Sequence, residues 1–316
     1  MTLDLLPFFQ AQLADWPLAR ANYDNLKQAL FKDVYLSPYE RIRLVCLPAR
    51  IASSSAKITA KGQVDRPCFL CRHRLPAEQR AYDYGSCNIL VNPFPVFSEH
   101  YTVPAKQHQD QSLMNEWPVF YRLLCELDEK YLVFYNGGRC GASAPDHLHF
   151  QLGLKSVMPL QADGIDTTHL QALLREGQVR LYRLEDYTRK AWVLEGPADA
   201  SQEAGQAMML MMQRLLTAFG RQLQEPQAAE QLVNVVGWRE AGQLRMVVFP
   251  RAAHRPHHFY SQDEAERLVT SPASVEMMGY YIFPRQEDFH KVTADTLRQI
   301  YQEVSLSSEA MHHILL

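Results

Sequence analysis

A short segment near the middle of the chain carries two histidines and a glutamine at alternating positions: His147-Leu-His149-Phe-Gln151. Alternate side chains of an extended strand point to the same face, so the three polar side chains are predicted to share one face. Leu148 and Phe150 would then pack into a core on the other face. A neutral imidazole whose second nitrogen is held by an acceptor can act as a nucleophile, so the pattern predicts a catalytic strand. The alternative is a pair of histidines that are solvated or satisfied on an edge strand.

The residues before this segment are rich in glycine and other small side chains, from Asn136-Gly-Gly through Gly-Ala-Ser143 to Asp146. Such a turn-prone segment can bring backbone N–H groups close to an anion. Gly141 and Ser143 are therefore candidates for binding phosphate. Asn136 follows a predicted strand over residues 131–135 and is a third candidate at the end of that strand.

Two cysteines form a second chemical motif, Cys68-Phe-Leu-Cys71. A tight knuckle of this length can turn both sulfurs toward one metal ion, although two more ligands are needed to complete a site. The alternatives are a buried thiol pair and a redox pair, and the redox pair is disfavoured because no thioredoxin-like pattern surrounds it. His73 and His100 are further ligand candidates.

The histidine segment, with the residues leading into it, resembles the active-site strand of the histidine-triad (HIT) superfamily. It resembles the branch with Gln as third member, which comprises galactose-1-phosphate uridylyltransferases, diadenosine tetraphosphate phosphorylases and GDP-hexose phosphorylases. In that branch the middle histidine attacks an α-phosphorus and forms a nucleotidyl-histidine intermediate. The resemblance implies that His149 is the nucleophile, that Gln151 binds on the phosphate side and that His147 belongs to the same set. One departure is that the family usually has Ser where this chain has Ala144, and Ser143 lies one residue earlier.

The resemblance also implies a structural zinc ion. In the uridylyltransferases, a histidine after a later strand and the first histidine of the active-site strand complete the site begun by the two cysteines. The corresponding residues here are Cys68, Cys71, His108 and His147. A closed four-ligand site would orient His149 without taking part in the chemistry.

Other candidate binding residues lie at a corner and in the second half of the chain. In the family, an Asn-containing corner lines the base and ribose pocket, which implies this role for Asn92 and Phe94; the alternative for Asn92 is an Asx-turn that holds the corner. Arg251 and Arg285 are candidates for contacting substrate phosphates, with ordinary surface arginines as the alternative. Related phosphorylases have an Arg-containing strand and a polar loop at a comparable place, so Arg50, just before a predicted loop over residues 51–62, is a weaker candidate, with a solvated basic loop as the alternative.

A Pro/His-rich loop contains His254, His257 and His258, where a second metal ion is the less favoured interpretation.

The order of predicted elements favours an α+β fold. Helical spacing of apolar residues predicts helices over residues 112–130 and 204–223, and apolar runs predict strands between them. The unit of strand, turn and strand over residues 231–250 repeats one over residues 88–104, which indicates an internal pseudo-repeat. With the resemblance, this implies tandem HIT-like halves joined edge to edge, in an antiparallel sheet with helices packed on it. We predict an N-terminal helical arm (1–40), a catalytic half (41–160) and a degenerate second half without His-x-His (161–316).

The composition describes an ordinary globular protein: 316 residues, a formal charge of −3, 47% hydrophobic and 21% charged residues. This balance lacks the basic excess expected of a nucleic-acid-binding protein, and no apolar run approaches membrane-spanning length. The first sixteen residues lack the pattern of a signal peptide. Six scattered cysteines are too few for a disulfide scaffold in a chain this long, so a cytoplasmic location is expected.

The function implied by the resemblance is nucleotidyl transfer or phosphorolysis of a nucleoside diphosphate sugar or dinucleotide. Inorganic phosphate or a sugar 1-phosphate would accept the nucleotidyl group, and the resemblance suggests a homodimer. The alternatives are a HIT-type hydrolase with water as acceptor, and a non-catalytic, zinc-stabilised nucleotide-binding protein. The sequence does not specify the base, the sugar or the acceptor.

Overall fold

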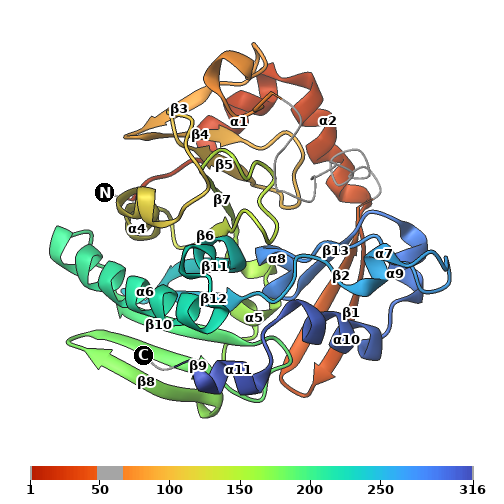
Figure 1. Cartoon of the computed structure of the whole chain (residues 1–316). Helices are drawn as coiled ribbons and strands as arrows, with labels where there is room; N and C mark the ends of the chain where they lie inside the picture. Colours follow the sequence, from red (N-terminus) through yellow and green to blue (C-terminus); the bar gives the residue numbers. More distant parts are fainter. Residues whose placement is uncertain (1, 48–66, 315–316) are drawn as a thin grey trace.

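The computed structural model describes residues 2–47 and 67–314, which form two β-sheets with helices packed around them (Figure 1). Arg50 and the predicted loop over residues 51–62 lie outside the described residues.

The larger sheet has ten strands, and every neighbouring pair is antiparallel. Long apolar runs such as Tyr131–Asn136 are buried along their whole length, which fits strands in the middle of a sheet covered on both faces. In spatial order the strands are β3 (Ala81–Tyr84), β4 (Cys87–Val91), β5 (Tyr101–Pro104), β7 (His149–Leu154), β6 (Tyr131–Asn136), β11 (Val233–Glu240), β12 (Gln243–Pro250), β10 (Ala191–Pro197), β9 (Val179–Leu184) and β8 (Leu170–Glu176).

The strand order divides this sheet into two halves with the same topology. The first five strands in space are β3-β4-β5-β7-β6, and reading from the other edge gives β8-β9-β10-β12-β11. The halves meet where β6 pairs with β11, with Asn136 opposite Asn234. The predicted edge-to-edge arrangement of tandem HIT-like halves in an α+β fold is therefore confirmed.

The alignment of the repeat predicted from the sequence is wrong by one hairpin. The sequence suggested that residues 231–250 correspond to residues 88–104, which form β4 and β5. In the structure, the hairpin β11–β12 of the second half corresponds to the hairpin β6–β7 of the first half. Each of these hairpins follows the helix that covers the sheet in its own half. Those helices are α4 (Trp117–Glu126), after β5, and α6 (Gln202–Leu223), after β10.

Each face of the large sheet carries its own core. Helices α4 and α6 cover one face, where Phe150, Met212 and Val235 are buried together. The other face is covered by the smaller sheet and by the C-terminal helices, where Phe134 and Trp238 are buried. Alternation along β7 places Phe150 and Leu152 on the α4 face, so Gln151 is on the opposite face.

The smaller sheet joins the two ends of the chain. Its strands are β1 (Leu30–Ser37), β2 (Glu40–Cys46) and β13 (Tyr280–Phe283), and β13 runs parallel to β2. The predicted helical arm over residues 1–40 is shorter in the structure. It consists of α1 (Leu6–Asp15) and α2 (Pro17–Asn25), and β1 follows because its backbone pairs with β2 over its length.

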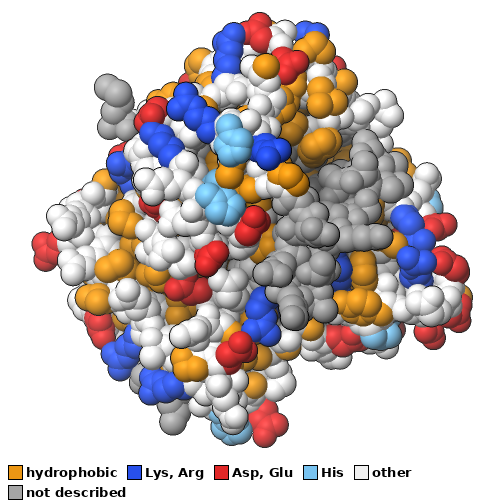
Figure 2. Space-filling view, turned by 45° about the horizontal axis from the view of Figure 1, so that its top comes forward, with side chains coloured by type: hydrophobic (Ala, Val, Ile, Leu, Met, Phe, Trp, Pro, Cys, Tyr) orange, Lys and Arg blue, Asp and Glu red, His pale blue; other side chains and the backbone are white. Residues whose placement is uncertain are grey.

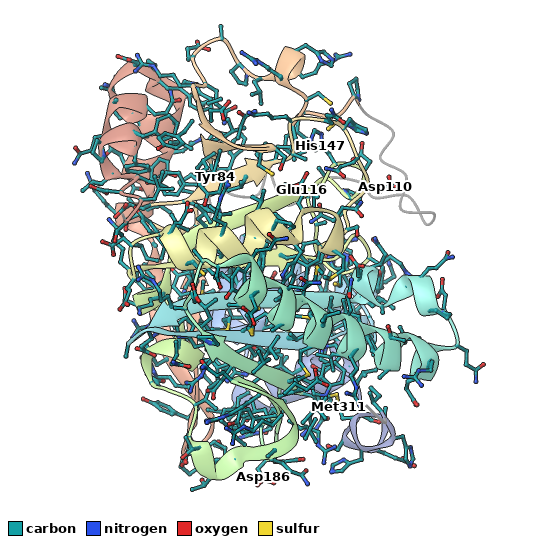
Figure 3. All side chains as sticks on the ribbon, turned by 90° about the vertical axis from the view of Figure 1, so that its left-hand side faces the viewer. Tyr84, Asp110, Glu116, His147, Asp186 and Met311 are labelled. Carbon is teal, nitrogen blue, oxygen red and sulfur yellow. The ribbon has the colours of Figure 1, made fainter. Side chains whose placement is uncertain are left out.

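The remaining α-helices are short elements around the C-terminal part: α5 (Pro159–Ala162), α7 (His257–Tyr260), α8 (Ser274–Met277), α9 (Gln286–Lys291), α10 (Ala294–Val304) and α11 (Ser308–His313). Within the described parts of the chain, no helix has the length and apolar character needed to cross a membrane. On the face drawn in Figure 2, Lys and Arg side chains are interspersed with Asp and Glu, in keeping with the small net charge. Figure 3 shows His147 in the upper, first-half part of the molecule, and Asp186 and Met311 toward the opposite end.

Candidate active site and metal site

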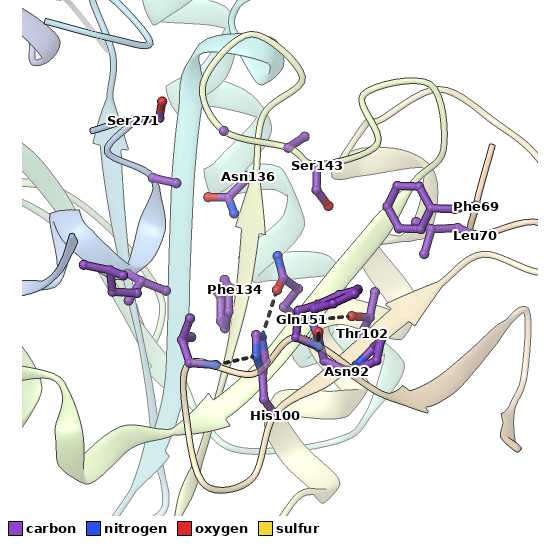
Figure 4. A pocket seen from close by; sticks show the side chains of 18 of the residues that line it. Phe69, Leu70, Asn92, His100, Thr102, Phe134, Asn136, Ser143, Gln151 and Ser271 are labelled. Carbon is purple, nitrogen blue, oxygen red and sulfur yellow. Dashed lines mark hydrogen bonds between the residues drawn. The ribbon is translucent and has the colours of Figure 1, made fainter. Parts of the chain in front are cut away.

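A cavity of about 670 Å³ lies between the two halves, beside the seam of the large sheet (Figure 4). The first half lines it with the corner at Asn92, with the end of β6 and with Gln151 of β7. The second half contributes residues 254–259, 269–276 and 282–284. Cavities of this size accommodate small organic ligands, and a position between two structural units is common for them.

His149 is a buried, neutral imidazole held in one orientation. Its Nδ1 lies 2.8 Å from the carbonyl oxygen of His147 and donates a hydrogen bond to it, so the lone pair of the neutral ring is on Nε2. Burial lowers the pKa of His149 to about 4. The side chain of Gln111 fixes the backbone of this residue, because it accepts from the His149 N–H at 2.9 Å and donates to its carbonyl at 3.0 Å.

Ser143 separates His149 from the cavity. Its hydroxyl oxygen lies 3.4 Å from Nε2 of His149, and Ser143 itself lines the cavity wall. His149 is only 2% exposed and is not among the residues that line the cavity. The serine displaced by one position from the family pattern thus still reaches the histidine.

Gln151 presents a hydrogen-bond donor to the cavity because His100 fixes its amide. The backbone N–H of Val96 donates to Nδ1 of His100 at 3.3 Å, so the proton of this neutral ring is on Nε2. That nitrogen donates to Oε1 of Gln151 at 2.9 Å. The amide nitrogen of Gln151 therefore points toward Asn136 and Ser143, as Figure 4 shows.

Asn136 presents a second donor to the cavity, because its amide oxygen is held by other groups and its amide nitrogen is left facing the cavity. Its Oδ1 accepts from Nδ2 of Asn234 at 2.9 Å and from the backbone N–H and hydroxyl of Ser274 at 2.9 and 2.6 Å. The Nδ2 group of Asn136 is then turned toward Gln151 (Figure 4). Two oriented amide donors and the Ser143 hydroxyl meet on one wall, an arrangement that suits an anion.

The glycines of the loop between β6 and β7 allow this loop to pack closely against the second half. Gly141 has φ +117°, and a Cβ there would lie 2.5 Å from Cβ of Ala273. At Gly137 a Cβ would lie 2.5 Å from the carbonyl oxygen of Gln231. Gly141 also lines the cavity, so the predicted phosphate contact and this packing constraint fall on the same residue.

The four predicted metal ligands come together close to the start of β7. One donor atom from each of Cys68, Cys71, His108 and His147 lies within 4.8 Å of the others. Sγ of Cys68 is 3.2 Å from Nδ1 of His147. Sγ of Cys71 is 3.3 Å from Nδ1 of His108 and 3.7 Å from Nδ1 of His147.

These distances fit a tetrahedral metal ion. Metal–sulfur bonds of about 2.3 Å and metal–nitrogen bonds of about 2.0–2.1 Å place neighbouring sulfur and nitrogen ligands about 3.5 Å apart. Nε2 of His147 donates to the carbonyl of Ala105 at 2.8 Å, so Nδ1 carries the lone pair that a metal ligand requires. Nδ1 of His147 thus faces the cysteines and Nε2 is bonded to Ala105. The contact of His147 with the His149 ring is made by its backbone carbonyl.

Asn92 and Phe94 form the predicted corner and line the cavity. Oδ1 of Asn92 accepts from the Phe94 N–H at 2.9 Å, which is the Asx-turn considered as its alternative role, and Nδ2 donates to Thr102. Phe94 is 44% exposed and Phe69, between the two cysteines, is 39% exposed. These two rings line the cavity as exposed apolar surface.

The structure places Arg251 and Arg285 outside the cavity wall, contrary to the prediction. Arg251 is fully buried, and its guanidinium donates to Asn234 and to the carbonyls of Val304, Pro272, Ala253 and His254. Arg285 forms ion pairs with Asp288, Glu264 and Glu287. Both are held by protein groups, and among the described residues the arginines that line the cavity are Arg74 and Arg255.

Sequence reasoning missed the residues that orient the site: His100 as the partner of Gln151, and Asn234 and Ser274 as partners of Asn136. His100 was considered only as a metal ligand, whereas its side chain lies against Gln151. The sequence Ser271-Pro-Ala-Ser274 could have indicated the partner of Asn136. Once β6 is paired with β11, this segment lies next to Asn136, and the Ser274 N–H donates to it.

The site combines a buried histidine on β7 with a cavity wall of hydrogen-bond donors, within a fold of two HIT-like halves. Comparison with known families agrees. Residues 8–154 match DUF4922, a domain of unknown function, and residues 165–315 match the GDPGP1-like, C-terminal domain. Each match covers just under half of the chain, and the C-terminal match supports the expected resemblance to the branch of the HIT superfamily that contains galactose-1-phosphate uridylyltransferases, diadenosine tetraphosphate phosphorylases and GDP-hexose phosphorylases.

Two Saccharomyces cerevisiae proteins are similar over a short stretch. Protein APA1 is 33% identical over 84 residues, which is 24% of this chain and 25% of the relative. Diadenosine 5',5'''-P1,P4-tetraphosphate phosphorylase 2 is 34% identical over 80 residues, 22% of this chain and 25% of the relative. The chain thus spans a quarter of the length of the curated relatives it matches.

Two solved structures share the fold over most of the chain. Yeast Ap4A phosphorylase Apa2 superimposes with a TM-score of 0.55 and 18% identity, covering 90% of this chain and 96% of Apa2. Its complex with Ap4A gives a TM-score of 0.51 and 19% identity, covering 90% and 97%. Identities this low support the architecture only.

Proposed function

We propose that the protein is a phosphorylase that transfers a nucleotidyl group from a dinucleotide or nucleoside diphosphate sugar to inorganic phosphate through His149. The observation that carries the proposal is the set of donors directed at one point beside a neutral imidazole. The amide groups of Asn136 and Gln151 are both oriented by their partners, and the Ser143 hydroxyl stands between them and His149.

In the proposed reaction the α-phosphoryl group lies against these donors. The Ser143 side chain turns aside, and the Nε2 lone pair of His149 forms a bond to phosphorus while the bond from phosphorus to the bridging oxygen breaks. The bridging oxygen leaves with its electron pair on the β-phosphate or the remaining nucleotide. An oxygen of inorganic phosphate then attacks the same phosphorus, and the bond from phosphorus to Nε2 breaks and releases the imidazole. The Nδ1 proton stays on the ring throughout and donates its hydrogen bond to the His147 carbonyl.

The charge that develops on the phosphoryl oxygens is stabilised by donors that are already in place. Because the amides of Asn136 and Gln151 are held by other side chains, little reorganisation is needed as charge builds up. Arg74 and Arg255, from opposite halves, line the same cavity and suit the flanking phosphates. The exposed rings of Phe69 and Phe94 suit the planar, apolar faces of a nucleobase.

The four-ligand site fits zinc, and a zinc ion there would act as a structural cross-link. Cys68, Cys71, His108 and His147 would hold it. His147 then couples the metal site to the nucleophile, because its backbone carbonyl holds Nδ1 of His149. Elemental analysis of the purified protein tests this assignment, and the expected result is zinc that is lost in Cys71→Ser.

The choice of a dinucleotide or nucleotide sugar rests on similarity. One relative is named a diadenosine tetraphosphate phosphorylase, a structure with the same fold is a complex with Ap4A, and the C-terminal half matches a GDPGP1-like domain. A cytoplasmic enzyme that uses inorganic phosphate is the simplest form of this proposal.

The experiment is a single-turnover assay with Ap4A and with GDP-, UDP- and ADP-sugars. Wild type should form an acid-labile nucleotidyl adduct, and His149→Ala should bind nucleotide without forming it, while His290→Ala, a change at an exposed histidine of α9, should behave as wild type. Products released with and without inorganic phosphate separate a phosphorylase from a hydrolase. If wild type binds nucleotides but never forms the adduct, the protein is a binding protein and the proposal is wrong.

A further inference from the structure

A second group of metal-ligating side chains lies on the second half, apart from the two cysteines. His257 and His258 begin the short helix α7, and Glu303 lies near the end of α10. One donor atom from each of the three lies within 4.8 Å of the others. The three residues come from segments 46 residues apart in the sequence, so tertiary structure brings them together.

The geometry of this group is fixed by its own contacts. Nδ1 of His257 is 2.5 Å from Oε1 of Glu303, and the backbone N–H of His257 donates to the other carboxylate oxygen at 2.8 Å. The rings of His257 and His258 lie face to face, with centroids 3.9 Å apart and planes inclined by 35°. Two adjacent imidazoles and a carboxylate are thus held together before any ligand binds.

His258 supplies an independent observation. Its side chain is buried, with 7% of the residue exposed, yet its Nδ1 has no hydrogen-bond partner among the described residues. A buried polar atom without a partner destabilises the folded chain, and a ligand at this nitrogen would remove that penalty. A bound cation beside the stacked rings would stabilise the cluster as a whole.

We propose that His257, His258 and Glu303 bind a divalent transition-metal ion. Two imidazoles and one carboxylate form a donor set that suits Zn²⁺, Co²⁺ or Ni²⁺, whereas Mg²⁺ and Ca²⁺ prefer sites made of oxygen atoms alone. The side chains of His257 and Glu303 are 59% and 34% exposed, so water can complete the coordination from the solvent side.

A metal ion at this site would connect α7, which adjoins the second-half wall of the cavity, to α10. Arg255 and Phe259, each two residues from His257, line the cavity, and the guanidinium of Arg255 lies 4.2 Å from the centre of the Phe259 ring. A metal ion that joins α7 to α10 would hold this pair in place. In the first half, Phe69 also lines the cavity, and it lies between Cys68 and Cys71 of the other candidate metal site.

Cobalt titration distinguishes the two sites, because thiolate ligands add intense charge-transfer bands that imidazole and carboxylate ligands lack. The full-length protein, purified without a nickel column and stripped of metal, is titrated with Co²⁺. We expect one component with thiolate bands and a further equivalent with only weak visible bands. In His257→Ala and in Glu303→Gln the second component should disappear while the thiolate component remains.

Two controls make the outcome decisive. His290→Ala removes an exposed histidine from neighbouring α9 and should retain both components, and Cys71→Ser should lose only the thiolate component. Circular dichroism establishes that each variant is folded, and the changes are placed at the two exposed ligands because His258 is buried. Binding of a single equivalent with thiolate bands by wild type, or a second equivalent that persists in Glu303→Gln, would overturn the proposal.

Discussion

The two central hairpins of the large sheet have the same place in their halves but differ at their connections. In the first half, β6 and β7 are joined by residues 137–148, which carry the glycines, Ser143 and His147. In the second half, β11 and β12 are joined by Ala241 and Gly242 alone, with φ of 49° and 75°. Positive φ at both positions is typical of a tight two-residue hairpin turn.

This difference concerns the segment that carries the candidate site. The strand β12 contains no histidine, so it has no counterpart of His149. The second half instead supplies partners for residues of the first: Asn234 and Ser274 fix the amide of Asn136, and Ala273 packs against Gly141. The second half thus helps to set the geometry of the candidate site.

The largest effect is expected from replacing a donor by an acceptor on the reactive strand. In Gln151→Glu, a carboxylate takes the place of the amide donor beside the substrate phosphate and repels it. Removing one oriented donor costs about 10²–10³-fold in kcat, so a loss at or above this range is expected in kcat/KM.

Gln243→Glu, at the exposed start of β12, is the matched change in the second half and should leave kcat/KM unchanged. Equal effects of the two changes would mean that the site does not lie at β7.

Replacing glycine by alanine should have different effects on stability and activity at the two connections. Gly141→Ala introduces strain at φ +117° and a Cβ only 2.5 Å from that of Ala273, so we expect about 3 kcal/mol of destabilisation and a loss of activity. Gly242→Ala at φ +75° has open space around the new Cβ, so it should cost about 1 kcal/mol and leave kcat/KM unchanged.

Urea unfolding and steady-state kinetics on both variants test this pair. A fully active Gly141→Ala would show that close contact between the loop and the second half is unnecessary.

The sequence was sufficient for features that depend on local chemistry. The alternation of His147, His149 and Gln151 predicted a strand, which the structure forms from His149 onward. The spacing of Cys68 and Cys71, together with the family resemblance, led to a group of four ligands that the structure brings together. Apolar periodicity also located the helices that became α4 and α6. Each of these inferences needs only a short stretch of chain, or a resemblance concentrated in one.

Features that depend on pairing between distant strands were missed or misplaced. The repeat was aligned to the wrong hairpin because β4–β5 and β11–β12 have similar local patterns, and only the sheet order distinguishes them. Arg251 was a candidate for contacting substrate phosphates, but the chain folds five acceptors around its guanidinium. Charge alone does not reveal whether an arginine faces a ligand or the interior.

A smaller effect is expected from the residue that orients the Gln151 amide. His100→Phe keeps a ring of similar size but removes the Nε2–H group that holds Oε1 of Gln151. The amide can then turn its oxygen toward the phosphate, and losing this hydrogen bond, worth about 1–1.5 kcal/mol, should lower kcat about tenfold.

A double-mutant cycle identifies His100 as a positioning residue rather than a structural one. In a Gln151→Ala background, His100→Phe should cause no further loss of kcat, because the group that it orients is absent. Equal losses in both backgrounds would mean that His100 acts on the fold and not through Gln151.

The smallest effects should separate the arginine that lines the cavity from the one predicted from sequence. Arg255→Ala removes a cation from the second-half wall and should raise KM about fivefold, corresponding to about 1 kcal/mol of lost charged contact. Arg285→Ala should leave KM and kcat unchanged, because its partners are acidic groups of the protein itself. Its effect should be on stability, since the carboxylate of Asp288 is fully buried and keeps only Lys291, at 3.5 Å, as a cationic partner. Steady-state kinetics and thermal unfolding on the two variants distinguish these roles, and a rise in KM for Arg285→Ala would restore it as a substrate contact.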